Sequence, residues 1–373
     1  MRVAPADNHL ARHARLRAEL VAASLDTLLV TSLPNIAYLT GLFASTAALL
    51  VAANGLQLVV DGRYLGTAQM RQRDLPGLRI VLVPAAGSFE ETVAGELLAA
   101  SPRRAGFEAD HLTVRQHQDL AGRLARSGTR PLLEATQGLV ERLRAVKDDW
   151  ELATLRDAGA RLSDAAKCII PKALAGMAER EVAGIIEAQL RRVGFDKPAF
   201  DTIVAAGPNS AVPHYRAGDR RLSEGDLVVM DFGGMLDGYA VDLSRTITVG
   251  RPGERERQLL EHVAAAQSAA FAAIGIGKAA TAVDAAARRA LEGVGLGDAF
   301  SHGTGHGLGL EIHERPRIGR WRADLPGEAL QAGMVFTLEP GAYLAGWGGA
   351  RIEDDVVVTS GGAEWLTDVP RLL

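Results

Sequence analysis

GDLVVMDFGGMLDGYAVDLSRT, residues 225–246, predicts a β-hairpin that carries two carboxylates in an apolar setting. The pair Asp237-Gly238, with glycines before it, marks the turn between two apolar runs. Side chains alternate along a strand, so Asp231 shares a face with core residues. An ionised carboxylate there needs a partner, and metal ligation by Asp231 and Asp242 explains the pattern better than the turn-forming role expected of Asp237.

A glycine-rich segment, SHGTGHGLGLEIHE (301–314), holds His302, His306 and His313. The first two have the spacing of a zinc-binding helix, but each glycine in the segment disfavours a helix by roughly 1 kcal/mol relative to alanine. Glycine permits close approach of the backbone to an ion or a substrate, and we interpret the segment in that way. A lone histidine is usually structural, whereas three in one such segment indicate a site.

Two glutamates end or interrupt later apolar runs. Glu339 follows MVFTL and precedes Pro340-Gly341, which puts its carboxylate at a strand end. Glu353 lies in ARIEDDVVVT and shares a strand face with Arg351. A salt bridge to Arg351 and metal ligation are both compatible with this pattern, because an arginine can orient a metal-binding carboxylate.

These segments supply four carboxylates and one imidazole: Asp231, Asp242, His306, Glu339 and Glu353. Such an oxygen-rich set suits hard divalent cations and holds enough carboxylate to bridge two of them. The sequence therefore predicts a dinuclear metal site. Hydrolysis is the expected chemistry, because metal ions activate water.

The composition is that of an ordinary globular protein. The chain has 373 residues, of which 47% are hydrophobic and 23% charged, and its net charge is −4. We expect two domains and neither nucleic acid nor a membrane as partner. No apolar run reaches the roughly 18 residues of a membrane span, and the N-terminal charges are unlike those of a signal peptide. The single cysteine, Cys168, excludes an internal disulfide and lies in an apolar run that predicts burial. These features predict a soluble, cytoplasmic protein.

Residues 1–133 predict a small α/β domain. The expected strands are the apolar runs 26–31, 47–53, 56–61 and 79–85. Asn54-Gly55 predicts a hairpin between the second and the third. Amphipathic stretches predict helices near 9–23, 63–72, 88–100 and 113–126.

Residues 134–373 predict an α+β domain that carries the candidate site. Asp148 or Asp149 is placed to cap a long helix beginning at Trp150. Further helices are expected near 178–193, 254–273 and 280–292. Further strands are expected near 202–206, 226–234, 238–248, 335–339 and 350–358. Helices grouped apart from hairpins favour an α+β rather than a doubly wound arrangement.

The motifs together resemble the proline-specific branch of the pita-bread metallopeptidases, which contains aminopeptidase P and prolidase. The matching segments are PHY (213–215), MDFGG…GYAVDLSRT (230–246), HGTGHGLGLEIHE (302–314), FTLEPG (336–341) and GGARIEDDVVVT (348–359). TSLPNIAYLTGL and VVDGRY, within 31–64, resemble the N-terminal domain of that branch. The resemblance spans nearly the whole chain. It implies a smaller, creatinase-like α/β domain followed by a catalytic pita-bread domain.

The resemblance also implies a division of labour among the ligands. Asp231 would bind one ion, His306 and Glu339 the other, and Asp242 and Glu353 both. The family's habit implies two ions of Mn²⁺, with Co²⁺ or Zn²⁺ as alternatives, and a hydroxide between them that attacks the carbonyl before proline. Glu339 would also relay a proton to the leaving amine.

Other residues are implied to hold the substrate. His214 and His313 match the pair that binds substrate and stabilises the tetrahedral intermediate. His302 and Arg351 are further candidates, as lining or supporting residues. Arg317 matches a position where some prolidases hold an arginine for the proline carboxylate, although other arginines nearby make a solvated basic loop equally compatible.

Two activities on proline-containing peptides stay open. The short chain and the GTGHG motif are equally compatible with small bacterial aminopeptidases P, and the main prediction is a Xaa-Pro aminopeptidase (aminopeptidase P). Arg317 supports the alternative, a Xaa-Pro dipeptidase (prolidase). A third hypothesis is a non-catalytic pita-bread binding module, but such modules typically lose metal ligands and this chain keeps all five. The resemblance further implies a homodimer.

Overall fold

The computed structural model describes residues 1–126, 131–323 and 327–371. The chain forms two compact units, Val3–Arg144 and Ala145–Leu373, and the first two residues group with the second unit. Across the described residues, no helix combines the length and apolar character that a bilayer span requires.

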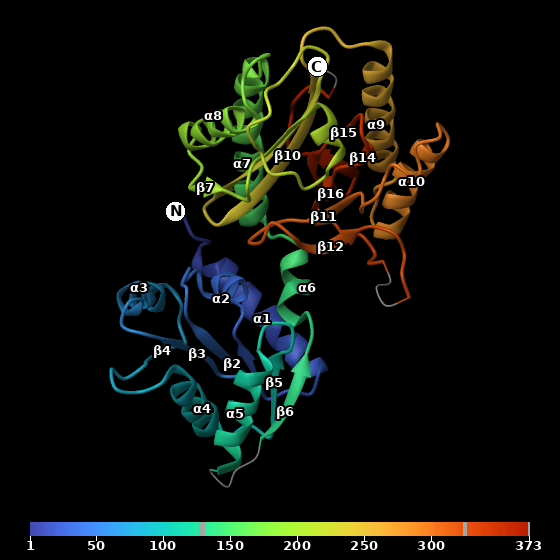
Figure 1. Ribbon diagram of the computed structural model, residues 1–373. Coiled ribbons are helices and arrows are strands. Elements are labelled where there is room, and N and C mark those ends of the chain that lie inside the picture. Colours follow the sequence, from blue (N-terminus) through green and yellow to red (C-terminus); the bar gives the residue numbers. More distant parts are fainter. Residues whose placement is uncertain (127–130, 324–326, 372–373) are drawn as a thin grey trace. The chain divides into compact units, whose positions relative to one another are not determined.

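The N-terminal unit contains a mixed six-stranded sheet in the order β4-β3-β2-β1-β5-β6 (Figure 1). Its strands are β1 (Thr27–Val30), β2 (Ala48–Ala52), β3 (Gly55–Val60), β4 (Leu78–Leu82), β5 (Arg104–Glu108) and β6 (Leu132–Thr136). β1, β2 and β3 pair antiparallel, and the other neighbours pair parallel. Because β6 pairs with β5, this unit runs beyond residue 133, where the sequence places the boundary.

Helices of the N-terminal unit supply the other half of its core. They are α1 (Ala6–Ala22), α2 (Leu33–Thr40), α3 (Leu65–Asp74), α4 (Phe89–Ala100), α5 (Val114–Arg126) and α6 (Leu139–Ala145). Leu97 of α4 and Leu120 of α5 pack with Leu29 and Leu50 of the sheet. The predicted hairpin is confirmed, but its two loop residues are Ala53 and Asn54, since Gly55 already pairs with Ala52.

The C-terminal unit is α+β, as the sequence predicts. Its helices are α7 (Asp149–Ile169), α8 (Glu179–Arg192), α9 (Glu254–Ala272) and α10 (Ala280–Glu292), with two 3₁₀ turns, η1 (Ile170–Lys172) and η2 (Gly207–Ala211). Asp148 caps α7 in a capping box with Glu151, which confirms the first of the two predicted caps. Cys168 on α7 is exposed beside Lys172, so the prediction of its burial is wrong.

The strands of this unit form several groups, and every strand pair among its described residues is antiparallel. One group joins β7 (Lys197–Pro198), β8 (Ile203–Ala206), β9 (Leu227–Leu236) and β10 (Tyr239–Thr248). A second runs β12-β11-β13-β16-β17, and a hairpin pairs β14 with β15. Their bounds are β11 (Gly305–Gly307), β12 (Glu314–Ile318), β13 (Val335–Leu338), β14 (Gly341–Leu344), β15 (Gly348–Arg351), β16 (Asp354–Thr359) and β17 (Gly362–Trp365).

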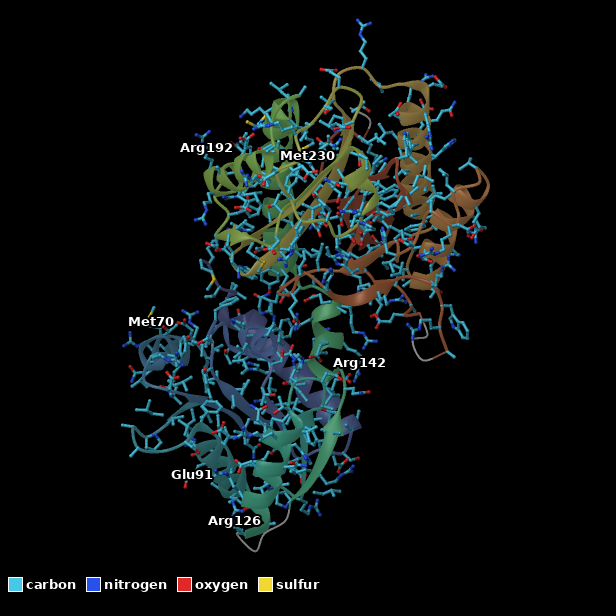
Figure 2. All side chains as sticks on the ribbon, viewed as in Figure 1. Met70, Glu91, Arg126, Arg142, Arg192 and Met230 are labelled. Carbon is cyan, nitrogen blue, oxygen red and sulfur yellow. The ribbon has the colours of Figure 1, made fainter. Side chains whose placement is uncertain are left out.

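Apolar packing places the helices against these strands. α7 and α8 pack on β9 and β10 around Met230 and Phe232, and α9 and α10 pack on β13 and β16 around Phe336. Met230 lies inside the unit, whereas Arg192 at the end of α8 points away from it (Figure 2). The strands are thereby held between helices, and the candidate site residues lie on them and on their connecting loops.

Candidate active site

The β9–β10 hairpin brings Asp231 and Asp242 onto one face. Asp237 and Gly238 form its turn with φ of 52° and 87°, as their identities predict. Asp231 pairs with Ser244, and Asp242 lies two residues before Ser244 on the same strand. Directly paired residues share a sheet face and side chains alternate, so the two aspartates are diagonal neighbours. Both are buried.

The second group of strands supplies the imidazole and the glutamates. His306 is the middle residue of β11, Glu339 follows β13, and Glu353 precedes β16. Glu353 forms an isolated bridge with Ser244, and its carboxylate accepts the hydroxyl of Ser244 at 2.6 Å. The hairpin is therefore joined to the second group of strands at the point where the carboxylates meet.

The glycines around His306 have a role that sequence interpretation missed. A Cβ atom at Gly305 would collide with the carbonyl of Thr337, and one at Gly307 with the carbonyl of Arg315. The close approach is thus to neighbouring backbone, because β11 lies between β12 and β13. The expectation that the segment is not a helix is confirmed.

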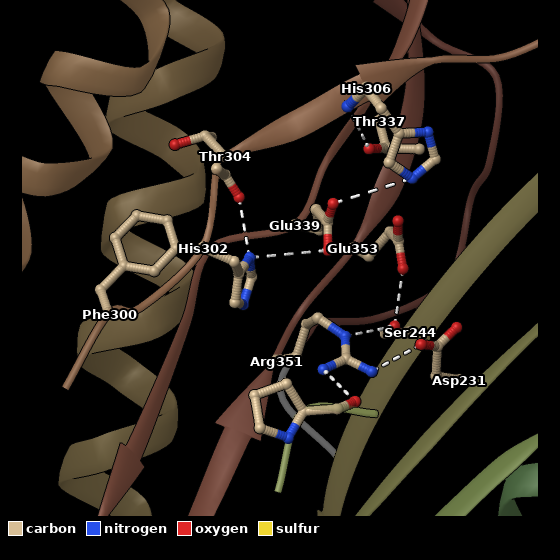
Figure 3. A network of polar contacts seen from close by, with 12 residues as sticks. Asp231, Ser244, Phe300, His302, Thr304, His306, Thr337, Glu339, Arg351 and Glu353 are labelled. Atoms are coloured by element: carbon tan, nitrogen blue, oxygen red, sulfur yellow. Dashed lines mark hydrogen bonds and ion pairs between the residues drawn. The ribbon is translucent and has the colours of Figure 1, made fainter. Parts of the chain in front are cut away.

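Five predicted ligands converge on one cluster. Atoms of Asp242, His306 and Glu353 lie within 4.8 Å of one another. Nε2 of His306 lies 3.7 Å from Oε1 of Glu339 and 3.9 Å from Oδ2 of Asp242. Figure 3 shows Glu339 between His302 and His306, and Arg351 beside Asp231.

The charges of this cluster are not balanced within the protein. Burial raises the pKa of Asp242 and of Glu353 well above the ordinary range, and the neighbouring carboxylates raise both further. Burial likewise raises the pKa of Glu339 to about 8. Oδ1 of Asp231 and Oε1 of Glu353 have no hydrogen-bond partner among the described residues. Buried oxygens left bare among like charges are where a cation belongs.

His306 is prepared to act as a ligand. Its Nδ1 lies 3.1 Å from the carbonyl of Gly307, which fixes the proton there and leaves the lone pair of Nε2 facing the carboxylates. Burial lowers the pKa of His306 to about 4, so the imidazole is neutral at pH 7. The donor set therefore fits divalent metal ions.

Arg351 compensates part of the negative charge. Its guanidinium donates to Asp231 at 2.5 Å, to the hydroxyl of Ser244 at 3.0 Å and to Tyr343 at 2.7 Å. The salt bridge to Glu353 that the sequence suggests is replaced by this arrangement, in which Ser244 lies between the two side chains. Arg351 thus supports a carboxylate, as the sequence allows, although that carboxylate is Asp231 and not Glu353. Its role as a substrate contact stays a prediction.

The three candidate substrate histidines lie around the cluster. His302 is held by Tyr343, whose hydroxyl lies 2.9 Å from Nε2, and its Nδ1 lies 3.9 Å from Glu339. The ring of His313 stands edge-on to that of His306, with centroids 4.3 Å apart. His214 is exposed on the loop before β9, and its charge helps to lower the pKa of both His302 and His313, after the larger effect of burial.

Arg317 lies at the edge of this arrangement. It pairs with His306 in the β11–β12 register, but its side chain is exposed and donates to the carbonyl of Arg320 at 3.1 Å. Tyr343 and Ser244 were missed by sequence analysis, because a tyrosine and a serine in apolar strands give no signal until their partners are known. Burial raises the pKa of Tyr343 to about 12, so the hydroxyl stays protonated as a donor.

This fold and cluster define a metal-dependent hydrolase, and comparison with known proteins narrows the class. The model of Metallopeptidase family M24 matches residues 153–360, and the Creatinase/Prolidase N-terminal domain matches residues 12–146. The chain belongs to metallopeptidase family M24. The predicted pita-bread domain with a creatinase-like N-terminal domain is confirmed.

The similar proteins include dipeptidases and an aminopeptidase. The structure of a Xaa-Pro dipeptidase from Bacillus anthracis is similar with a TM-score of 0.90 at 33% identity, covering 98% of this chain and 100% of that one. A Xaa-Pro dipeptidase of Pyrococcus furiosus is 42% identical over 235 residues, 63% of this chain and 66% of that protein. An X-Pro aminopeptidase from Thermotoga maritima is similar with a TM-score of 0.85 at 29% identity, covering 97% and 99%.

Proposed function

We propose that this chain is a Xaa-Pro dipeptidase that uses two divalent metal ions. The observation that carries the proposal is the cluster of Asp242, His306 and Glu353, with bare buried oxygens, in a chain that aligns end to end with a Xaa-Pro dipeptidase. The relatives thus favour the dipeptidase, which the sequence offers as the alternative, over the aminopeptidase. The C-terminal unit, Ala145–Leu373, would form the catalytic domain, in place of the expected 134–373.

The metal ions would be held by all five predicted ligands: Asp231, Asp242, His306, Glu339 and Glu353. Mn²⁺ is the proposed metal, since carboxylate oxygens suit it, with Co²⁺ and Zn²⁺ as alternatives. When bound, such ions lower the pKa of water and polarise the scissile carbonyl.

The protein's own groups would then handle the proton and the substrate. The carboxylate of Glu339 would accept a proton from the attacking water and pass it to the proline nitrogen as the peptide bond breaks. His214 and His313 would donate to the developing oxyanion. Arg317 would pair with the carboxylate of proline, which a dipeptidase must recognise.

One observation favours the second candidate, a Xaa-Pro aminopeptidase. The guanidinium of Arg317 is exposed and donates to the carbonyl of Arg320. In this conformation Arg317 does not form the binding site for the proline carboxylate that a dipeptidase needs. The likeness to the Thermotoga maritima aminopeptidase agrees with this alternative.

The deciding experiment compares two substrates. Chelator-stripped protein is incubated with and without Mn²⁺ and given Ala-Pro or Ala-Pro-Ala, and the products are identified by mass. We expect metal-dependent cleavage of Ala-Pro with the tripeptide left intact, and a raised KM for Ala-Pro in Arg317→Ala but not in the control Arg320→Ala. Release of alanine from the tripeptide would establish the aminopeptidase instead. Metal binding without cleavage of either peptide would support the non-catalytic module.

A further inference from the structure

Glu179, the first residue of α8, is a fully buried carboxylate outside the metal cluster. Its Oε1 accepts hydrogen bonds from the backbone N–H of Ala206 at 2.8 Å and from Nδ2 of Asn209 at 2.9 Å. Its Oε2 accepts from the N–H of Gly218 at 3.1 Å. These donors are neutral groups that satisfy the buried carboxylate by hydrogen bonds alone. What Glu179 holds in place therefore follows from where its donors lie in the chain.

The three donors belong to the two ends of one loop. Ala206 ends β8, Asn209 lies in η2, and Gly218 lies shortly before β9. The backbone of α8 adds to the same attachment, because the N–H of Glu179 donates to the carbonyl of Arg220 at 3.0 Å and that of Arg180 to Gly218 at 3.1 Å. The start of α8 thus holds both ends of the segment 206–220.

This segment carries His214 to the candidate site. Nδ2 of Asn209 also donates to the hydroxyl of Tyr215 at 2.9 Å, so the residue next to His214 is linked to Glu179 through Asn209. The ring of Tyr215 packs against Ile203 and Val229. The carbonyl of Pro213, on the other side of His214, lies 3.4 Å from Nη1 of Arg351. His214 is exposed, and its place rests on these neighbours.

We propose that Glu179 is a positioning residue that acts through His214, by fixing the loop that aims this histidine at the substrate carbonyl. The inference rests on the proposed function, which gives His214 its part in the reaction. It assigns no contact with substrate or metal to Glu179 itself.

A double-mutant cycle tests this coupling. Glu179→Gln keeps one acceptor oxygen but presents an NH₂ group to the N–H of Gly218 or, if flipped, to Ala206. We expect it to lower kcat/KM for Ala-Pro by about 10–100-fold, the range for residues that support reacting groups. In the His214→Ala background the same substitution should change kcat/KM by less than about twofold, which is the scatter within which independent substitutions add. The effect of Glu179→Gln would then depend on the presence of His214.

The matched control is Glu187→Gln, at an exposed position of the same helix, which should leave kcat/KM unchanged in both backgrounds. Equal losses from Glu179→Gln in both backgrounds would overturn the proposal, because Glu179 would then act independently of His214. Melting temperatures of all variants separate a general loss of folding from the coupled effect.

A second measurement needs no activity and uses metal-free protein. The side chain of Arg216 is 90% exposed in the middle of the loop, so tryptic cleavage after it reports how firmly the loop is held. Cleavage there, identified by mass, should be faster in Glu179→Gln than in wild type or Glu187→Gln. An unchanged cleavage rate would overturn the proposal that Glu179 fixes the loop, even if the enzyme is active. A wild type inactive on Ala-Pro would refute the proposed function, but the cleavage rate would still show whether Glu179 fixes the loop.

Discussion

Each unit buries a glutamate beside a strand end, and the surroundings of the two glutamates are opposite. Glu108 ends β5 and accepts hydrogen bonds from the N–H groups of Thr31 at 2.6 Å and Ser32 at 2.7 Å and from Nδ2 of Asn35 at 2.6 Å. Glu353 accepts the hydroxyl of Ser244, while its Oε1 lacks a partner among the described residues.

The pKa values of these groups follow the same contrast. Burial raises the pKa of both carboxyls, but the donors around Glu108 counteract the shift, whereas Asp242 and Glu339 add to it at Glu353. A carboxylate whose oxygens are hydrogen-bonded within the protein avoids much of the cost of burial. One left bare among like charges is held at a cost in stability that a bound cation relieves, as at many functional sites.

Removing one carboxylate of the cluster should have the largest effect, with opposite changes in activity and in the stability of the metal-free protein. Asp242→Asn keeps an oxygen that can accept from the N–H of Leu243 but removes a metal ligand, so kcat/KM should fall by at least about 10²–10³-fold. The same substitution should raise the melting temperature of the metal-free protein, because it removes a repelled charge. Kinetics with Ala-Pro measure the first effect, and calorimetry of the metal-free protein measures the second. A lower melting temperature without metal would contradict this account of the cluster.

Removing the compensating cation should have the next largest effect. Arg351→Met leaves Asp231 without its guanidinium partner, and we expect a loss of about 10–100-fold in metal affinity or activity. Titration of the metal into apoprotein, followed calorimetrically, measures the affinity. Arg371→Met, which removes a half-buried arginine paired with Asp354, is the control; an equal loss of affinity there would argue for a nonspecific charge effect.

Removing a hydrogen-bond donor from Glu108 should lower the stability of the fold and leave catalysis intact. Asn35→Ala removes the donor at Oε1 of Glu108 and should lower the free energy of unfolding by about 1–3 kcal/mol. Urea unfolding and kcat/KM for Ala-Pro are the two measurements. A large fall in kcat/KM for a fully folded variant would show that this network serves the reaction.

The smallest effect is a difference in pH dependence between the units. Burial raises the pKa of Glu339 to about 8. Its contribution to folding stability is therefore fully present below the pKa that it has in the unfolded chain and is lost as pH rises through 8. Burial lowers the pKa of His9 to about 3, so its contribution is present above about 6.5 and is lost as pH falls toward 3.

The backbone amides of β13 and β14, which flank Glu339, should therefore lose protection from hydrogen exchange in metal-free protein as pH rises from 6.5 to 8, by up to about 1.4 kcal/mol per pH unit for one such group. Protection in α1 should fall only below pH 6.5. Hydrogen exchange of peptides from these elements, corrected for the intrinsic rate at each pH, tests the difference. An equal loss in α1 on the alkaline side would contradict it, and added metal should suppress the loss in β13 and β14.

The sequence by itself determined the features that depend on local rules. The alternation of side chains put Asp231 on a core face, the Asp237-Gly238 pair placed the hairpin turn, and Asp148 capped its helix. Each rule acts within a few residues. The expected boundary at residue 133 fell short for the same reason, because β6 joins its sheet through β5, far earlier in the chain.

Only the tertiary structure decided which groups face each other. Arg351 bonds to Asp231, 120 positions away, and leaves Glu353, its near neighbour in the sequence, to Ser244. Gly305 and Gly307 are needed because three strands approach closely at β11, and Tyr343 matters because His302 and Arg351 meet at its hydroxyl. Such partners are selected by the packing of segments distant in sequence, so spacing within one segment carries no record of them.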